Sequence, residues 1–242
     1  ENVQVTARWA VRDESGKLNL NHAPASALRV ILGVDGSKAR EIRASLPRSE
    51  EGAGQAGDKR WFSTVNDVVT SGLISPDVFK TIDLSNLTVY TVPDPDQPYG
   101  YINLNTASPK VLEAVLDISP DMANTVAAAR PFRSLADVCH VAGKPATMFN
   151  FKPEPETPDS MPKALSLESN AFRVFASAQV RRPGGGSVLS SVSVEAVVVL
   201  LADGGHVFTF WQMTGGDRGE PLPEAASSQK EANSADEVNT AT

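Results

Sequence analysis

An internal repeat constrains this chain more than any other feature of its sequence. Residues 18–44 read LNLNHAPASALRVILGVDGSKAREIRA, and residues 102–128 read INLNTASPKVLEAVLDISPDMANTVAA, an offset of 84 residues. The segments that follow, 62–68 and 132–138, align at an offset of 70, so the first copy carries 14 extra residues. We place this insertion at 47–60, because its polar, Gly-rich sequence is typical of a surface loop. The chain therefore contains two copies of one packing unit.

Each copy has the sequence pattern of short helices joined by a tight turn. In the second copy, Ser108 can cap a helix that begins at Pro109. Apolar residues then recur at helical spacing at Val111, Leu112, Val115 and Leu116. A second helix is expected over about 121–130. The first copy follows the same plan, with a turn at 33–36 and a helix over 37–45.

Period-two alternation marks the C-terminal part of the chain as a sheet. Apolar residues alternate with polar ones at Phe172, Val174, Ala176, Ala178 and Val180. Two more strand-like runs follow, each after a Gly-rich turn, which predicts an antiparallel meander over 171–214. A strand over 3–11 precedes the repeats and is expected to join this sheet. The helical units then form an insertion at about 22–150, and a further strand-like run, 88–92, lies between them.

These patterns divide the chain into six segments. We expect an N-terminal strand (1–21), a first helical repeat (22–101, with the loop 47–60), a second helical repeat (102–150), a linker (151–170), a closing antiparallel sheet (171–214) and a disordered tail (215–242). The linker is rich in proline and carboxylates. The tail lacks apolar periodicity.

Composition limits the classes of function. The net charge of −7 argues against nucleic acid as the main partner, because phosphate binding needs clustered Lys and Arg. Cys139 is the only cysteine, which excludes internal disulfides and Cys-based zinc sites, and we expect it to be a buried apolar side chain. No signal peptide or membrane-length apolar run is present. The chain starts at Glu1 without Met, so we expect a soluble fragment of a longer protein.

The search for an active site favours a protein that is not an enzyme. His22, His140 and His206 lie in three different segments, and none of the common hydrolase, zinc-protease or nucleotide-binding patterns occurs. An enzyme with a dispersed site stays open as a rival class. No catalytic residue and no organic cofactor are predicted.

Acidic residues in turns suggest a calcium site. Asp94 and Asp96 alternate with prolines, and a stiff loop would preorganise their carboxylates for a hard cation. The other acidic candidates in turns are Asp13, Glu14, Asp117 and Asp121. None of them fits an EF-hand loop, so Asp94 and Asp96 are our candidate metal ligands.

The order of helix, tight turn and helix also resembles the helix-hairpin-helix module of DNA-binding proteins. In such modules backbone N–H groups of a Gly-rich turn approach a phosphate. The first copy keeps Gly33 and Gly36 but adds Asp35, whose charge repels phosphate. The second copy has Asp117 and Pro120 at these positions, and proline has no N–H to donate. Phosphate binding is therefore not expected at the second turn, and a DNA-binding protein of competence type is the alternative function.

Two stretches resemble a known family. Residues 13–21, DESGKLNLN, resemble the signature Asp-Glu-x-Gly-Lys-Ile-Asn-Leu-Asn of type II secretion system protein K, and residues 102–107 resemble the second signature of that family. The resemblance covers about residues 5–213. It implies an α+β fold: a pilin-like antiparallel sheet with a large inserted helical domain of two SAM-like or helix-hairpin-helix-like repeats. Calcium binding, known for some members, is also implied.

The resemblance further implies a minor pseudopilin that caps the tip of the secretion pseudopilus through protein–protein assembly. Its partners would be other minor pseudopilins, and its soluble domain would lie in the periplasm. An N-terminal helix, which the sequence lacks, would anchor it in the bacterial inner membrane. The region after residue 213 has no counterpart in the family pattern. We expect partner contacts on the strand 3–11 and on the exposed side of the closing sheet.

Overall fold

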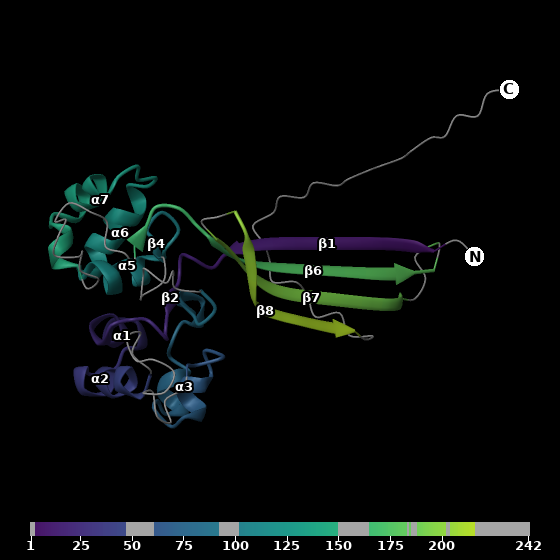
Figure 1. The fold of residues 1–242 in the computed structure, drawn as a ribbon, viewed down its shortest axis with the longest axis horizontal. Coiled ribbons are helices and arrows are strands. Elements are labelled where there is room, and N and C mark those ends of the chain that lie inside the picture. The colour runs from purple at the N-terminus through teal and green to yellow at the C-terminus, as the bar shows by residue number, and fades with distance from the viewer. Residues whose placement is uncertain are drawn as a thin grey trace.

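The computed structural model consists of a helical part and a long sheet that extends from it (Figure 1). It describes residues 3–46, 61–91, 102–149, 165–182, 184, 188–201 and 204–215. The elements are β1 (Gln4–Asp13), β2 (Leu18–Asn19), α1 (Ala25–Leu32), α2 (Gly36–Ser45), α3 (Asp67–Thr70), α4 (Pro76–Phe79), η1 (Leu84–Asn86), β3 (Leu87–Thr88), β4 (Ile102–Asn103), α5 (Pro109–Leu116), α6 (Pro120–Ala128), α7 (Leu135–Ala142), η2 (Ala146–Met148), β5 (Leu165–Ser166), β6 (Ala171–Arg181), β7 (Val188–Leu200) and β8 (His206–Gly215).

The main sheet joins the N-terminal strand to the C-terminal meander. Its order is β1-β6-β7-β8, and all three pairings are antiparallel. β1 runs beside β6 from the pair Gln4 and Arg181 to the pair Asp13 and Phe172. The prediction that the first strand joins the closing sheet is therefore confirmed, and the helices lie in the chain between β1 and β6.

The core of the protein lies in the helical part. Its fully buried side chains come from both copies and include Leu28, Leu32, Ile42, Leu112 and Leu116. Helices α1 and α5, the first helix of each copy, contact one another. One continuous apolar cluster therefore holds the two copies together.

The two copies use the same hydrogen bonds around their shared Asn-Leu-Asn start. The side-chain oxygen of Asn19 accepts from the backbone N–H of Asn21 at 2.9 Å, and that of Asn103 accepts from Asn105 at 2.8 Å. The Asn21 side chain in turn bonds both backbone groups of Phe62, at 2.8 and 2.9 Å. The equivalent side chain, Asn105, bonds both backbone groups of Phe132 at 2.7 and 3.0 Å. Each asparagine thus fixes a segment that follows the two helices of its copy.

Two short parallel pairings differ from the predicted strands. The run 88–92 was expected as a strand, but the structure has only the two-residue β3, which pairs with β2. The predicted linker 151–170 is wrong over its last residues, because Leu165 is buried and β5 pairs with β4, while 151–164 lie outside the described residues. Each pairing anchors the start of one copy, and the sequence hides it because two residues are too few for a periodic signal. The predicted loop 47–60 and the tail after Gly215 lie outside the described residues.

No described helix combines the length and apolar character needed to cross a membrane.

Candidate functional site

One face of the main sheet is apolar across all four strands. Residues directly opposite each other on antiparallel strands project to the same face, and the register aligns Trp9, Ala176, Val194 and Met213 in one row. The next row contains Val11, Val174, Ala196 and Trp211. We call this the apolar face; it consists of the rows just given together with Val5, Ala7, Phe172, Ala178, Val180, Val192, Val198 and Phe208.

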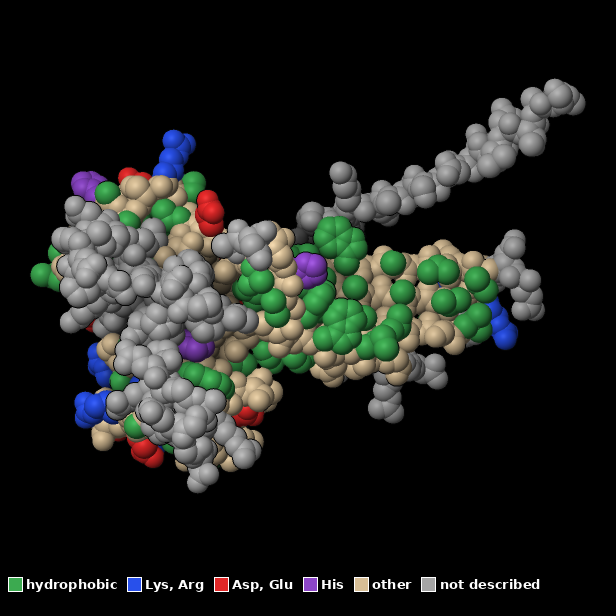
Figure 2. Space-filling model, in the orientation of Figure 1, with side chains coloured by type: hydrophobic (Ala, Val, Ile, Leu, Met, Phe, Trp, Pro, Cys, Tyr) green, Lys and Arg blue, Asp and Glu red, His purple; other side chains and the backbone are tan. Residues whose placement is uncertain are grey.

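The large side chains of the apolar face are exposed. Trp9 is 76% exposed, Met213 65% and Trp211 59%. All described helices lie beyond one end of the sheet, so none of them covers this face (Figure 1). Figure 2 shows hydrophobic side chains spread along the strands. A contiguous exposed apolar surface of this kind marks a site of protein or membrane contact.

Aromatic rings on β8 stiffen one margin of the apolar face. The His206 and Phe208 rings meet edge to face with centroids 5.6 Å apart, and Phe208 meets Trp211 in the same way at 5.6 Å. Such edge-to-face pairs are favourable ring geometries. The rings are therefore held in place while their surfaces stay exposed, which suits a preformed contact surface.

The opposite face of the sheet is mixed. It carries the charged residues Arg8, Arg12, Arg173 and Glu195 together with the apolar residues Ala10, Phe175, Val197, Val199 and Phe210. Near the helical part, Tyr90 packs on this face with its ring 5.0 Å from that of Phe210. The Arg173 guanidinium lies 5.1 Å from the centre of the Tyr90 ring, a cation–π distance.

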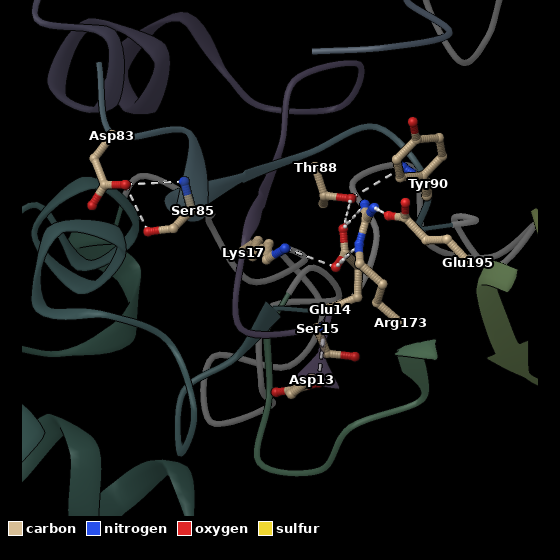
Figure 3. Close-up of polar contacts among 10 residues, drawn as sticks. All are labelled: Asp13, Glu14, Ser15, Lys17, Asp83, Ser85, Thr88, Tyr90, Arg173 and Glu195. Carbon is tan, nitrogen blue, oxygen red and sulfur yellow. Dashed lines mark hydrogen bonds and ion pairs between the residues drawn. The ribbon is translucent and has the colours of Figure 1, made fainter. Parts of the chain in front are cut away.

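A buried ion network joins the sheet to the helical part (Figure 3). The Glu14 side chain is fully buried. Its Oε1 accepts from Thr88 Oγ1 at 2.7 Å and from Arg173 Nη2 at 3.0 Å. Its Oε2 accepts from Lys17 Nζ at 2.8 Å and from Arg173 Nε at 3.1 Å. Arg173 also pairs with Glu195 through Nη1. One arginine from β6 therefore links β7 to the segment that leads into the first copy.

This network determines the protonation of Glu14. Burial alone raises the pKa of a carboxyl, but hydrogen bonds and charges from Arg173 and Lys17 outweigh it and hold the pKa of Glu14 below its ordinary value. The residue is thus an ionised structural carboxylate whose oxygens are already occupied. In the sequence, Glu14 stands out as a turn carboxylate within the signature 13–21 and Arg173 as a charge on an alternating strand, but nothing local indicates that the two pair.

The other acidic candidates in turns have local structural partners. Asp13 accepts from the Ser15 N–H at 2.9 Å and from the Thr106 hydroxyl. Lys144 Nζ donates to the backbone oxygen of Asp117 at 2.7 Å. Among the described residues, no group of three or more His, Cys, Asp and Glu side chains is placed to hold a metal ion.

The remaining acidic turn candidate, Asp121, is placed, and the calcium candidates are not. Asp121 sits in the first turn of α6. Asp94 and Asp96 lie outside the described residues, so they stay a prediction.

The histidines do not come together. The His22 ring lies against Trp61 with centroids 5.0 Å apart, His140 belongs to α7, and His206 meets Phe208 edge to face. Cys139 is half-buried rather than buried, and burial raises the pKa of its thiol.

The hairpin turns show why phosphate is a poor ligand for the repeats. Gly33 adopts a left-handed φ of 64°, and Asp35 then caps α2. Its Oδ1 accepts from the N–H groups of Ser37 at 2.7 Å and Lys38 at 2.9 Å. A carboxylate therefore occupies the N–H groups that a phosphate would use.

The second turn has a different sequence and is also a poor site for phosphate. Asp117 takes the left-handed position with φ 53°, and Pro120 starts α6. Ser119 caps the helix by accepting from the N–H of Met122. The helix-hairpin-helix alternative is therefore not supported at either turn.

Comparison with known proteins confirms the resemblance read from the sequence. Residues 102–147 match the family model described as Type II secretion system (T2SS), protein K. No curated protein matches the chain. The crystal structure of the GspK-GspI-GspJ complex from the enterotoxigenic Escherichia coli type 2 secretion system contains a similar chain. The identity is 12%, 87% of this chain and 80% of that chain are covered, and the TM-score is 0.47.

Proposed function

We propose that this chain is a minor pseudopilin of the type II secretion system that works by protein–protein assembly. The observation that carries the proposal is the exposed apolar face. An exposed apolar patch that spans a whole sheet is typical of a surface that a partner covers. The family model over residues 102–147 supports it. The described residues bring no titratable groups into a catalytic arrangement, and an assembly function needs none.

The apolar face is suited to an α-helix. The apolar side chains extend along four strands of 10 to 13 residues, so the surface is long. Burying about 500 Å² of apolar area would contribute roughly 12 kcal/mol before the cost of ordering. In our proposal the occupant is an apolar helix that precedes residue 1 in the native protein and anchors it in the inner membrane. The sheet and helical part then lie in the periplasm.

The helical part adds bulk at one end of the sheet (Figure 1). In the proposed assembly this bulk lies at the tip of the pseudopilus and prevents further subunits from being added above it. The partners are the other minor pseudopilins. The ion network of Glu14 and Arg173 supports this role, because a cap must hold a fixed orientation relative to the sheet that docks it.

We propose calcium binding only at Asp94 and Asp96. Two carboxylates in a Pro-containing loop suit a hard cation. Calorimetric titration of the chain with calcium tests this point, with Asp94→Asn and Asp96→Asn expected to remove the binding heat.

Reconstitution tests the function. We expect the chain to form a stable complex with the soluble domains of the other minor pseudopilins from the same organism, measured by size-exclusion chromatography with light scattering. As a matched control, an unrelated periplasmic protein of similar charge should elute separately. Folded partners that never co-elute with this chain would refute the proposal.

A further inference from the structure

The two edge strands of the sheet differ in their protection against pairing with another chain. β1 and β8 lie at opposite margins of the sheet, and each pairs with one neighbour among the described strands (Figure 1). Every second residue of an edge strand directs its N–H and C=O away from the sheet. These groups pair readily with an added strand unless side chains prevent it.

β1 carries such protective side chains. Arg8 and Arg12 lie within the strand, and Asp13 ends it. Charged residues on an edge oppose strand addition because the incoming strand would have to desolvate them or approach a like charge.

β8 carries none. Its ten residues, HVFTFWQMTG, include no Lys, Arg, Asp, Glu or Pro, and most of them are exposed. Ten residues is a long edge strand for a sheet of this size. Within the part of the chain that the structure describes, the edge of β8 therefore lacks the protection against pairing that the edge of β1 has.

A bulge limits where pairing can occur. Val197 faces Phe210 and Val198 faces Phe208, so Thr209 is the extra residue on β8. The Thr209 hydroxyl is buried without a hydrogen-bond partner. A bulge bends its strand, so the straight part of the edge is residues 210–215, about 20 Å long.

We infer that the outer edge of β8, over residues 210–215, binds an extended strand of another minor pseudopilin, which adds to the sheet through main-chain hydrogen bonds. The identity of the partner rests on the proposed function. Only an extended backbone offers N–H and C=O groups at the spacing of this edge.

The side chains of β8 set the chemistry of the added strand. On one face it lies beside Trp211 and Met213, and on the other beside Gln212 and Thr214. A strand that continues both faces alternates apolar with neutral polar residues and contains no proline directed at the edge. No charge on β8 fixes its direction.

Hydrogen exchange measured by mass spectrometry on the reconstituted complex tests the inference. We expect exchange in a peptide covering 210–215 to slow at least tenfold at about three amides, the outward-facing half of the six. A peptide covering 4–13, the other edge, serves as the internal control and should keep its exchange rates.

A matched pair of variants gives a second readout. Gln212→Lys places a charge on the polar side of the outer edge of β8 and should weaken assembly about tenfold. Thr6→Lys places the same charge on the same face of β1 and should leave the affinity within about twofold. Both positions are exposed, so neither change disturbs the core.

The outcomes separate the inference from the proposed function. A complex that forms without slower exchange at 210–215 overturns the added strand and leaves the assembly function in place. Absence of any complex removes both. Slower exchange at 210–215 that appears in the free chain and grows with its concentration would identify a second copy as the occupant and would also overturn the inference.

Discussion

The helical part and the sheet of this protein differ in whether their large apolar side chains are buried. The helical part buries its large apolar side chains among themselves, with Leu28, Leu112 and Leu116 fully inaccessible. The sheet has apolar residues in regular rows but leaves Trp9 and Trp211 exposed. Among the described residues, the first region covers its large apolar side chains and the second leaves several of them exposed. In the proposed assembly, the sheet makes the partner contacts and the helical part adds bulk.

A pair of alanine substitutions should separate the two regions with the largest effect. Leu112→Ala removes a fully buried side chain from the helical core and should lower the free energy of unfolding by about 3 kcal/mol. Trp9→Ala removes a larger side chain from the apolar face and should change it by less than about 0.5 kcal/mol. Urea denaturation of both variants measures the difference. Equal losses would show that the face is packed in the free protein.

The ion network between the two regions should give the next largest effect. Glu14→Gln removes the charge that pairs with Arg173 and Lys17 in a buried site, and should cost about 2 kcal/mol of unfolding free energy. Lys80→Gln, which breaks an exposed pair with Asp77, is the matched control and should cost less than about 0.5 kcal/mol.

The lowered pKa of Glu14 predicts that the stability of the fold depends on pH. The pKa of Glu14 is lower in the folded protein than its ordinary value of 4.5. Its ionised form therefore stabilises the fold above pH 4.5, and this stabilisation is lost as the pH falls through the folded pKa. Thermal unfolding between pH 6 and 3 should show a smaller loss for Glu14→Gln than for the unchanged chain. A parallel decline in the two proteins would contradict the assigned network.

Within the helical part, the two copies should respond alike. Asn21→Ala and Asn105→Ala each remove a side chain that bonds both backbone groups of a phenylalanine. Each should cost about 1–2 kcal/mol, because buried backbone groups lose their partners. Chemical denaturation measures both variants. A loss of unfolding free energy in only one of the two variants would show that the repeated hydrogen bonds contribute unequally to stability.

The smallest expected effect concerns nucleic-acid binding. Because Asp35 occupies the N–H groups at the first hairpin, we expect no shift of duplex DNA in a gel at low salt. Asp35→Asn keeps the cap and removes its charge, and it should behave identically. A shift that fades as salt rises would restore the helix-hairpin-helix alternative.

The sequence predicted the elements whose signals are local. Helical spacing, Ser108 before Pro109 and the alternation along β6 lie within a few neighbouring residues, and the structure has helices and strands there. The common Asn-Leu-Asn start indicated a repeat, but not that Asn21 and Asn105 bond to phenylalanines 41 and 27 residues away.

Features that depend on distant residues were not predictable in this way. The network of Glu14, Arg173 and Glu195 joins residues 159 and 22 positions apart, and only the register of the sheet brings them together. The apolar face could be predicted strand by strand, but its continuity follows from the bulge at Thr209 and the pairing of all four strands. The parallel pairings of β2 and β4 involve two residues each, too few for any periodic signal.

The most direct test of an open apolar face is site-specific photocrosslinking in the assembled pseudopilus. A photoreactive phenylalanine derivative at position 9 lies on the apolar face, and one at position 6 lies on the opposite face of the same strand. We predict that position 9 crosslinks to an apolar helix, either one that precedes residue 1 or one from a partner, and that position 6 does not. Crosslinks from position 6 alone, or from neither position, would contradict the account.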